Sequence, residues 1–242
     1  TYADNTDLDT TVDIGPNGSV TYTITGTVVN TAVGKITNKA NVNSVDTATL
    51  THTSESSTIE GSKTTLTTNY APGGQIVYTI SLQNIGNGFA VDIPVVDGFS
   101  TIGVTQSDNN YGNAFTSWTI TAITSGAGTD AGIFSDNADL NVLVDIAPGG
   151  SVVYTITATV SELADSTITN QATQQGRPIG TIKHEPGGTL VAAVKSSATT
   201  TYVPGGTIAY TLTMTNSGTG FADVPVKDLI SSNTTNLIGG GI

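Results

Sequence analysis

The chain of 242 residues is long enough for about two domains that each bury a core. Charged residues make up only 11% of it, and 7 Lys and Arg against 19 Asp and Glu leave a net charge of −12, which argues against a nucleic acid as partner. Cysteine is absent from the sequence, so disulfides, thiolate metal sites and a cysteine nucleophile are excluded.

The residues that replace charged ones are typical of β-strands and turns. Thr, Gly, Asn and Ser dominate the polar part of the sequence, and β-branched residues dominate the apolar part. No apolar run approaches the roughly 18 residues of a membrane span, so we expect no membrane insertion in this segment. The acidic balance also disfavours binding to an anionic membrane surface.

The first 57 residues recur later in the chain at a spacing of 132 residues. Val-Asp-Ile at 12–14 returns at 144–146, and Ile-Thr-Asn at 36–38 returns at 168–170, without a gap between them. A repeat of this length indicates a chain of similar domains. Residues 1–57 are therefore interpreted as the C-terminal half of a repeat.

Residues 58–190 are predicted to hold a complete repeat, with a connector from about residue 177 onward. Apolar and polar side chains alternate over 75–82 and again over 152–160, which predicts two strands with one buried face each. Pro-Gly-Gly and Asn-x-Gly turns separate the strands, and no stretch has the period of a helix. Roughly seven to nine short strands in about 115 residues are typical of an antiparallel sandwich.

Residues 191–242 match the beginning of the complete repeat and are interpreted as the N-terminal half of the next one. Lys195 corresponds to Lys63, and after a one-residue deletion Asp228 aligns with Asp97. The chain is therefore expected to be either a window on a longer repetitive protein or a subunit whose half-repeats are completed by neighbouring chains. Its predicted fold is all-β, with tandem immunoglobulin-like antiparallel β-sandwiches.

A pattern of turns and strands links both copies to a known family. It consists of a Pro-Gly-Gly turn, a Tyr-Thr-Ile strand, an Asn-x-Gly turn and a strand that ends in Asp. In the complete repeat these are Pro72-Gly73-Gly74, Tyr78-Thr79-Ile80, Asn84-Ile85-Gly86 and Val96-Asp97. The pattern resembles the conserved repeat domain called domain of unknown function 11, found in tandem on prokaryotic surface proteins. The resemblance implies an extracellular stalk or surface-coat module rather than a reaction.

Lys63, Asp97 and Asn170 follow the order of residues in related bacterial surface sandwiches, which join their first and last strands by a Lys–Asn amide bond with the help of a buried acid. Lys63 lies at the start of the repeat, Asp97 ends its third predicted strand, and Asn170 lies in its last. Desolvation leaves such an amine uncharged and nucleophilic. A protonated buried acid polarises the Asn carbonyl and passes protons as ammonia leaves. The resemblance therefore implies a self-formed isopeptide bond, made once and without enzymatic turnover.

The incomplete repeats carry parts of the same set. Asn38 is the predicted acceptor of the first repeat, whereas Lys195 and Asp228 await an Asn further downstream. If half-repeats of different chains combine, Lys195 of one subunit joins Asn38 of the next. The alternative interpretation is structural, with the Lys at a strand end, the Asp capping a turn and the Asn bonded to backbone groups.

Acidic and amide side chains recur in one loop of each copy, where they are candidate ligands for Ca²⁺. These residues are Asp4, Asn5 and Asp7 in the first copy and Asp136, Asn137 and Asp139 in the second. Their spacing lacks the EF-hand pattern, and Asx-rich turns account for the same residues. Apart from this calcium hypothesis, we expect no cofactor.

Few other side chains carry chemistry. His52 and His184 are equivalent residues, too few for a mononuclear metal site, and are predicted to be exposed in the connectors. Trp118, Phe115 and Tyr111 are assigned to the core and its edge rather than to a sugar-binding platform. The sequence has no nucleophile elbow, so we expect no hydrolase and no other enzyme.

These observations favour an extracellular structural module at the cell surface, acting as a stalk, a surface fibre or a filament subunit. Its expected partners are neighbouring repeats or copies of itself, joined by strand complementation. Two alternatives stay open. One is an adhesin module that binds a ligand or carbohydrate, with the segment 101–137 as its candidate site, and the other is a spacer stiffened by calcium.

Overall fold

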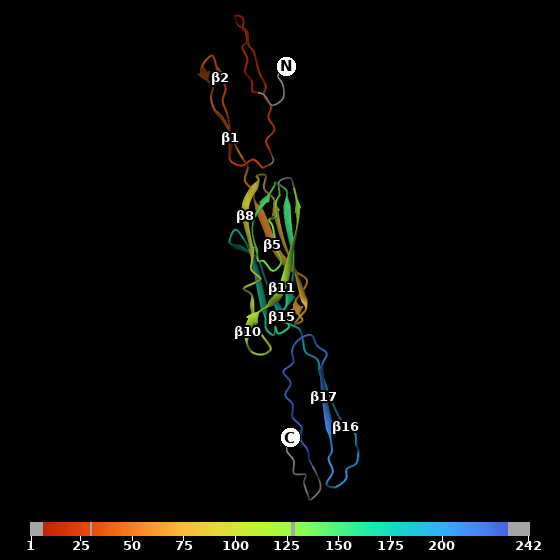
Figure 1. Cartoon of the computed structure of the whole chain (residues 1–242). Coiled ribbons are helices and arrows are strands. Elements are labelled where there is room, and N and C mark those ends of the chain that lie inside the picture. The colour runs from red at the N-terminus through yellow and green to blue at the C-terminus, as the bar shows by residue number, and fades with distance from the viewer. Residues whose placement is uncertain (1–6, 30, 127–128, 232–242) are drawn as a thin grey trace.

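The computed structural model describes residues 7–29, 31–126 and 129–231 of the chain. Over these ranges the backbone forms strands and loops without a helix, so the protein is all-β, as predicted. The same ranges therefore contain no helix long and apolar enough to cross a membrane. Three parts follow one another in space, an N-terminal pair of hairpins, a central sandwich and a C-terminal hairpin drawn in blue (Figure 1).

The central part is an antiparallel sandwich of two sheets. Its strands are β5 (Ile59–Thr65), β6 (Asn69–Tyr70), β7 (Gln75–Asn84), β8 (Ala90–Asp97), β9 (Gly103–Thr105), β10 (Tyr111–Asn113), β11 (Phe115–Ser125), β12 (Leu140–Ile146), β13 (Ser151–Val160), β14 (Ile168–Gln174) and β15 (Arg177–Pro186). One sheet has the order β11-β13-β7-β5 and the other β12-β8-β14-β15-β6, in which the short β15–β6 pair alone is parallel. β9 and β10 form a separate hairpin.

The core lies between these sheets and follows from the alternation of the central strands. Along β7, Ile76, Tyr78, Ile80 and Leu82 are buried, whereas the residues between them are half-buried or exposed. β13 repeats the pattern beside it. The strands predicted over 75–82 and 152–160 are therefore confirmed. Each fully buried Ile or Leu side chain contributes about 1.5–3 kcal/mol of burial free energy.

The predicted connector is wrong in its first part, because Arg177–Pro186 form β15 and belong to the sandwich. β15 pairs with β14 along its length and passes close to Lys63 of the opposite sheet. Gly180 makes this approach possible, since a side chain there would collide with Lys63. The strand signal is weak in the sequence because Pro178 and Gly180 interrupt it and only His184 of this strand is fully buried.

The two outer parts are hairpins without a second layer. The N-terminal part contains β1 (Lys35–Asn38), β2 (Asn41–Val42), β3 (Val45–Asp46) and β4 (Leu50–Thr53), with β1 paired to β4 and β2 to β3. The C-terminal part contains β16 (Val191–Ser197) paired to β17 (Tyr210–Asn216). Residues that correspond to the sandwich core are exposed here, so that Ile36 is 47% exposed where its counterpart Ile168 is 0%.

Candidate functional site

A lysine and an aspartate from the two sheets meet inside the sandwich. Lys63 comes from β5 and Asp97 from the end of β8, and Lys63 Nζ lies 2.5 Å from Asp97 Oδ2. Both side chains are 0% exposed. The ammonium nitrogen also lies 4.6 Å from the ring centre of Tyr78 and 5.5 Å from that of Phe99. The pair is therefore enclosed by aromatic rings instead of water.

Burial changes the protonation chemistry of both partners. It lowers the pKa of Lys63 to about 8, although the charge of Asp97 acts in the opposite direction. It also raises the pKa of Asp97 to about 6, against the lowering effects of Lys63 and Asn170. The two pKa values are thus much closer together than in water. Transfer of a proton from the ammonium to the carboxylate costs correspondingly less, and it produces a neutral amine beside a neutral acid.

Asn170 completes the cluster from β14. Ala172 pairs directly with Asp97, so Asn170, two residues earlier, faces the same side of the sheet. It is buried, and its side chain offsets part of the rise that burial causes in the pKa of the Asp97 carboxyl and in the pKa of the Tyr78 hydroxyl. Neither polar atom of its carboxamide makes a hydrogen bond of normal geometry with any described residue.

Several buried polar atoms without a well-formed hydrogen bond lie together in this cluster. Oδ1 of Asp97, the hydroxyl of Tyr78 and both carboxamide atoms of Asn170 are buried, and within the described part of the chain each lacks a well-formed hydrogen bond. A buried polar group without a partner costs about 1–3 kcal/mol. A native site that tolerates several of them requires an explanation, and a chemical role is one.

His184 belongs to this cluster, and the prediction that it is an exposed connector residue is wrong. It is completely buried on β15, opposite Ile168, and its ring meets Tyr78 edge-on at a centroid distance of 5.3 Å. Burial is the largest effect and lowers the pKa of His184. A backbone hydrogen bond with Thr67 raises this pKa in part, whereas the charge of Lys63 lowers it. Burial therefore disfavours the charged form of the imidazole. One sequence signal could have predicted its burial. His184 alternates with Ile182, which places both side chains on one face of a strand.

The C-terminal part repeats the lysine–aspartate pair without burying it. Lys195 Nζ lies 2.6 Å and 2.7 Å from the two carboxylate oxygens of Asp228. It also lies 4.6 Å from the ring centre of Tyr210, the counterpart of Tyr78. The side chains of this pair are 38% and 43% exposed. The predicted acceptor Asn38 is exposed on β1, in the part of the chain at the opposite end of the sandwich (Figure 1).

The candidate calcium ligands are only partly described. Asp4 and Asn5 lie outside the described residues, and Asp7 and Asp136 are exposed. Asp139 accepts hydrogen bonds from the backbone of Phe99 and Ser100 and from the Ser100 hydroxyl.

Asn137 has a φ of 57° and is bonded to β11, since its side-chain oxygen accepts a hydrogen bond from Trp118 N and its backbone N–H donates to the Trp118 carbonyl. Over the described ranges, no group of three or more His, Asp or Glu side chains gathers in a way that could hold a metal ion. These hydrogen bonds therefore account for Asn137 and Asp139, and calcium binding stays a prediction.

The segment 101–137, expected to carry a ligand site in an adhesin, forms the β9–β10 hairpin and the edge strand β11. Phe115 and Trp118 are buried in the core, as predicted, and the Trp118 indole N–H donates to the carbonyl of Ala138. Tyr111 is exposed on β10. The aromatic residues of this segment thus serve mainly the core.

A defined joint connects the N-terminal part to the sandwich. The buried Asn84 at the end of β7 donates to the carbonyl of Gly88 and accepts from the backbone N–H groups of Thr58 and Gly86. Gly88 lies so close to the backbone of Glu55 that a side chain would not fit. The connector is therefore fixed against the Asn-x-Gly turn by short polar contacts.

The same joint connects the sandwich to the C-terminal part. Asn216 at the end of β17 donates to the carbonyl of Gly220 and accepts from the backbone N–H groups of Leu190 and Gly218. These contacts correspond one by one to those of Asn84. The connection between repeats is thus a repeated structural element and not a variable linker.

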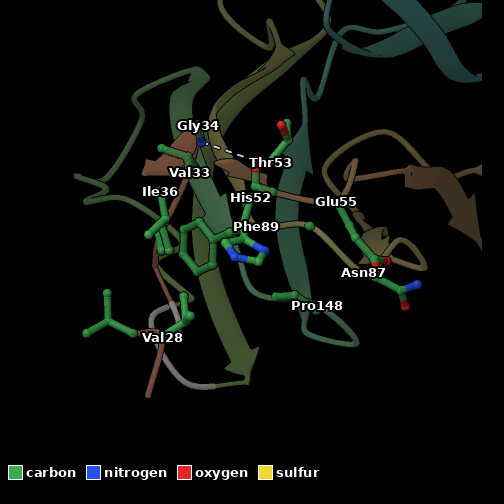
Figure 2. A pocket seen from close by; sticks show the side chains of 14 residues that line it. Val28, Val33, Gly34, Ile36, His52, Thr53, Glu55, Asn87, Phe89 and Pro148 are labelled. Atoms are coloured by element: carbon green, nitrogen blue, oxygen red, sulfur yellow. Dashed lines mark hydrogen bonds between the residues drawn. The ribbon is translucent and has the colours of Figure 1, made fainter. Parts of the chain in front are cut away.

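A hollow lies beside the first joint (Figure 2). Ile36 and His52 of the N-terminal hairpin face Phe89 of the sandwich across it, with Val28 and Pro148 at its margin. Its walls are mainly apolar. The hollow therefore exposes apolar side chains of the N-terminal part.

Comparisons with known proteins gave no match, whether to a family model, to a curated protein or to a solved structure. The geometry of the cluster is therefore the basis for inferring its chemistry. It brings together a nucleophile, an acid and an acceptor in a site closed to water.

Proposed function

We propose that the chain is a load-bearing segment of tandem immunoglobulin-like repeats, in which Lys63 and Asn170 are joined by an isopeptide bond. One observation carries this proposal. The fully buried Lys63–Asp97 pair lies beside the buried carboxamide of Asn170, whose polar atoms have no well-formed hydrogen bond within the described chain. An ordinary structural role would leave these groups paired.

The reaction follows from the protonation chemistry of the pair. Asp97 first takes a proton from the Lys63 ammonium, and the neutral amine attacks Cγ of Asn170. A second proton moves from the attacking nitrogen to the amide nitrogen of Asn170 as the Cγ–Nδ2 bond breaks. Ammonia leaves and carries the proton held by Asp97, which returns to its ionised form. The net change is one new amide bond and the loss of one ammonium ion.

The bond would give the sandwich mechanical strength. β5 lies in the four-stranded sheet and β14 in the five-stranded one, so the bond would join the two layers covalently. It would also close the chain between residues 63 and 170 into a loop, which limits how far the sandwich can extend under force. Kinetic stability of this kind suits a surface protein.

The repeated joints support a role as a spacer. Asn84 and Asn216 fix successive parts by the same contacts, so the direction of the chain is set at each connection. Together with the few basic residues, this favours an extracellular stalk or surface fibre whose partners are neighbouring repeats or other copies. The resemblance to the conserved repeat domain of prokaryotic surface proteins agrees with this location.

The test is the mass of the purified full chain under denaturing conditions, with peptide mapping around Lys63 and Asn170. We expect a mass lowered by one ammonia and a peptide that contains both residues. Lys63→Ala and Asn170→Ala restore the mass expected from the sequence, whereas Lys183→Ala, which removes an exposed lysine of β15, leaves the bond intact. An unmodified mass in a folded chain contradicts the proposal.

A further inference from the structure

We propose that the hydroxyl of Tyr78 donates a hydrogen bond to the carbonyl oxygen of Asn170 as the Lys63 amine attacks, and that it stabilises the negative charge that develops there. Tyr78 is then a catalytic residue of the crosslinking step. This inference rests on the proposed function, because it assigns a further group to that reaction. It concerns the rate of bond formation, whereas the proposed function concerns whether the bond forms.

The reaction needs a donor that the lysine–aspartate pair does not supply. Attack of an amine on a carboxamide turns the carbonyl oxygen into an oxyanion, and donors placed beforehand at this oxygen lower the barrier. The one proton that Lys63 and Asp97 share leaves with the ammonia. Both side chains are 0% exposed, so the site is closed to solvent. The donor therefore has to come from another side chain of the cluster.

The ring of Tyr78 is fixed beside the nucleophile. Tyr78 is fully buried on β7, and Lys63 Nζ lies 4.6 Å from its ring centre. Its ring meets Phe99, Phe115 and His184 edge-on, at centroid distances of 5.6 Å, 6.4 Å and 5.3 Å. Contacts from three other rings leave the Tyr78 side chain little freedom. The hydroxyl at its tip is therefore held in one place before the reaction begins.

This hydroxyl carries a proton that no other group uses. It is buried, and within the described part of the chain it has no well-formed hydrogen bond. Tyr154, a second buried tyrosine of the same core, instead donates its hydroxyl proton to the carbonyl of Ala131 at 2.9 Å. Burial raises the pKa of the Tyr78 hydroxyl above its ordinary value. Tyr78 therefore remains a donor between about pH 6 and about pH 8, where the lysine–aspartate pair shares one proton.

The carboxamide of Asn170 is the acceptor next to this hydroxyl. It acts on the hydroxyl as a hydrogen-bonding group and offsets part of the rise that burial causes in the pKa of Tyr78. Neither group has a well-formed hydrogen bond among the residues that the structure describes. An interaction that forms fully only when the oxygen becomes negative lowers the barrier instead of stabilising the starting state. The arrangement is therefore that of a donor directed at the transition state.

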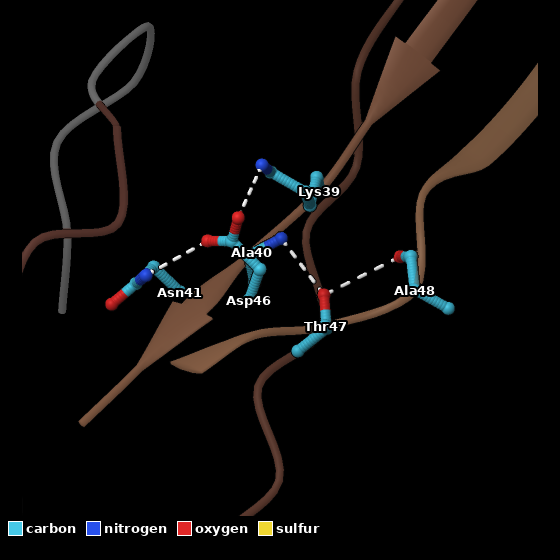
Figure 3. Close-up of polar contacts among 6 residues, drawn as sticks. All are labelled: Lys39, Ala40, Asn41, Asp46, Thr47 and Ala48. Atoms are coloured by element: carbon cyan, nitrogen blue, oxygen red, sulfur yellow. Dashed lines mark hydrogen bonds and ion pairs between the residues drawn. The ribbon is translucent and has the colours of Figure 1, made fainter. Parts of the chain in front are cut away.

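A lysine, an aspartate and an asparagine also meet on the surface of the N-terminal hairpin, and there they bond to one another (Figure 3). Lys39 Nζ lies 2.6 Å from Asp46 Oδ2, and the Asn41 carboxamide donates to Oδ1 of the same carboxylate at 2.8 Å. Both oxygens of this carboxylate thus have a partner, whereas Oδ1 of Asp97 and the carboxamide of Asn170 have none that is well formed in the described chain. The unpaired groups of the sandwich therefore reflect their arrangement and not their residue types.

The test compares two variants of the full chain that each remove one tyrosine hydroxyl and keep the ring. Tyr78→Phe removes the unpaired hydroxyl, and the matched control Tyr154→Phe removes the one that donates to Ala131. Each chain is refolded at a pH between the pKa values of Asp97 and Lys63, and the loss of ammonia is followed by mass. We expect Tyr78→Phe to crosslink about 100- to 1,000-fold more slowly than the unchanged chain. Tyr154→Phe should crosslink at nearly the unchanged rate.

The stability of the two variants should change in the opposite order. In an Asn170→Ala background, where no bond forms, Tyr154→Phe loses a buried hydrogen bond and should lower the urea midpoint of unfolding. Tyr78→Phe removes a buried hydroxyl without a well-formed partner and should leave this midpoint unchanged or raise it. A slow reaction in a variant of full stability cannot come from a structural defect.

A second measurement needs no variant of Tyr78. The new amide keeps the carbonyl oxygen of Asn170, so the Tyr78 hydroxyl should still donate to it in the crosslinked chain. We expect a slowly exchanging hydroxyl proton in the NMR spectrum, assigned to Tyr78 by its contacts with the ring protons. The hydroxyl of Tyr154, which is bonded to Ala131, should give the same kind of signal and serves as the internal control.

The outcomes separate this inference from the proposed function. Slow crosslinking in Tyr78→Phe but not in Tyr154→Phe, together with a protected hydroxyl proton of Tyr78, supports it. An unchanged rate in Tyr78→Phe overturns the inference and leaves the Lys63–Asn170 bond standing. So does a spectrum that contains the hydroxyl proton of Tyr154 without that of Tyr78. If the refolded, unchanged chain loses no ammonia, the proposed function and this inference are both overturned.

Discussion

The chain contains two lysine–aspartate pairs that share their geometry and differ in their surroundings. Lys63 and Asp97 are completely buried, whereas Lys195 and Asp228 are more than one-third exposed. In both pairs the ammonium nitrogen lies 4.6 Å from the ring centre of a tyrosine. Similar strand pairing thus assembles both pairs, and only the two-sheet sandwich removes the water from one of them. Local strand pairing fixes the positions, and desolvation supplies the reactivity.

The largest difference between the two pairs should appear when one lysine is removed. Lys63→Ala leaves the Asp97 carboxylate buried without a partner, which costs about 3–5 kcal/mol of unfolding free energy. Lys195→Ala breaks an exposed pair and costs less than about 1 kcal/mol. Urea unfolding measures this difference in an Asn170→Ala background, so that no crosslink contributes. Trp118 fluorescence reports the sandwich, and circular dichroism reports the strands of the whole chain, including the C-terminal hairpin. Equal losses for the two variants would show that burial is not what distinguishes the pairs.

Replacing both buried charges together should have the opposite effect on the free energy of unfolding. Lys63→Met with Asp97→Leu removes the desolvation cost of the ion pair, so the sandwich is expected to be unchanged or more stable by about 1–4 kcal/mol. The same urea measurement in the Asn170→Ala background tests it. With Asn170 retained, the double variant should also form no crosslink. A large loss of stability would mean that the pair is retained for folding and not for chemistry.

The pH dependence of crosslinking should reflect the two shifted pKa values. Below about 6 both groups hold their protons, so the Lys63 amine is charged and cannot attack. Above about 8 both have lost them, so Asp97 is ionised and no acid remains to assist the leaving ammonia. Between these values the pair shares one proton, and the rate is expected to be highest and nearly constant.

Chain recovered unfolded from inclusion bodies and refolded at a series of pH values allows this rate to be measured by mass. The rate should fall about tenfold for each pH unit outside the plateau. A rate that continues to rise well above pH 8 would rule out Asp97 as the acid.

The sequence predicts the parts of this site that depend on local pattern. The alternation along β7 and β13 identifies the core strands, and the resemblance to surface sandwiches with a Lys–Asn bond identifies Lys63, Asp97 and Asn170 as a candidate set. The structure places Lys63 and Asp97 in contact and Asn170 beside them, which no spacing in the sequence could establish. Bond formation itself depends on distances and protonation that only the folded site determines.

What the sequence does not predict depends on contacts between distant segments. β15 carries Pro178 and Gly180 and has a single fully buried side chain, so its pattern is that of a connector. The sequence consequently predicts an exposed His184, whereas the structure buries it in the core. Residues 19–28 show the reverse case, since they match the sequence of β13 but form no strand in the structure. A strand pattern indicates a strand only where neighbours exist to pair with it.

The most direct test of the central claim is the state of the Lys63 side-chain nitrogen in the intact, folded chain. With ¹⁵N incorporated only at lysine Nζ, an isopeptide bond converts one ammonium into a secondary amide that gives a distinct N–H signal in a two-dimensional NMR spectrum. We predict that this signal is present and that it disappears in Asn170→Ala and in Asp97→Asn, while Lys183→Ala retains it. A folded chain whose spectrum contains no such amide signal would contradict the account.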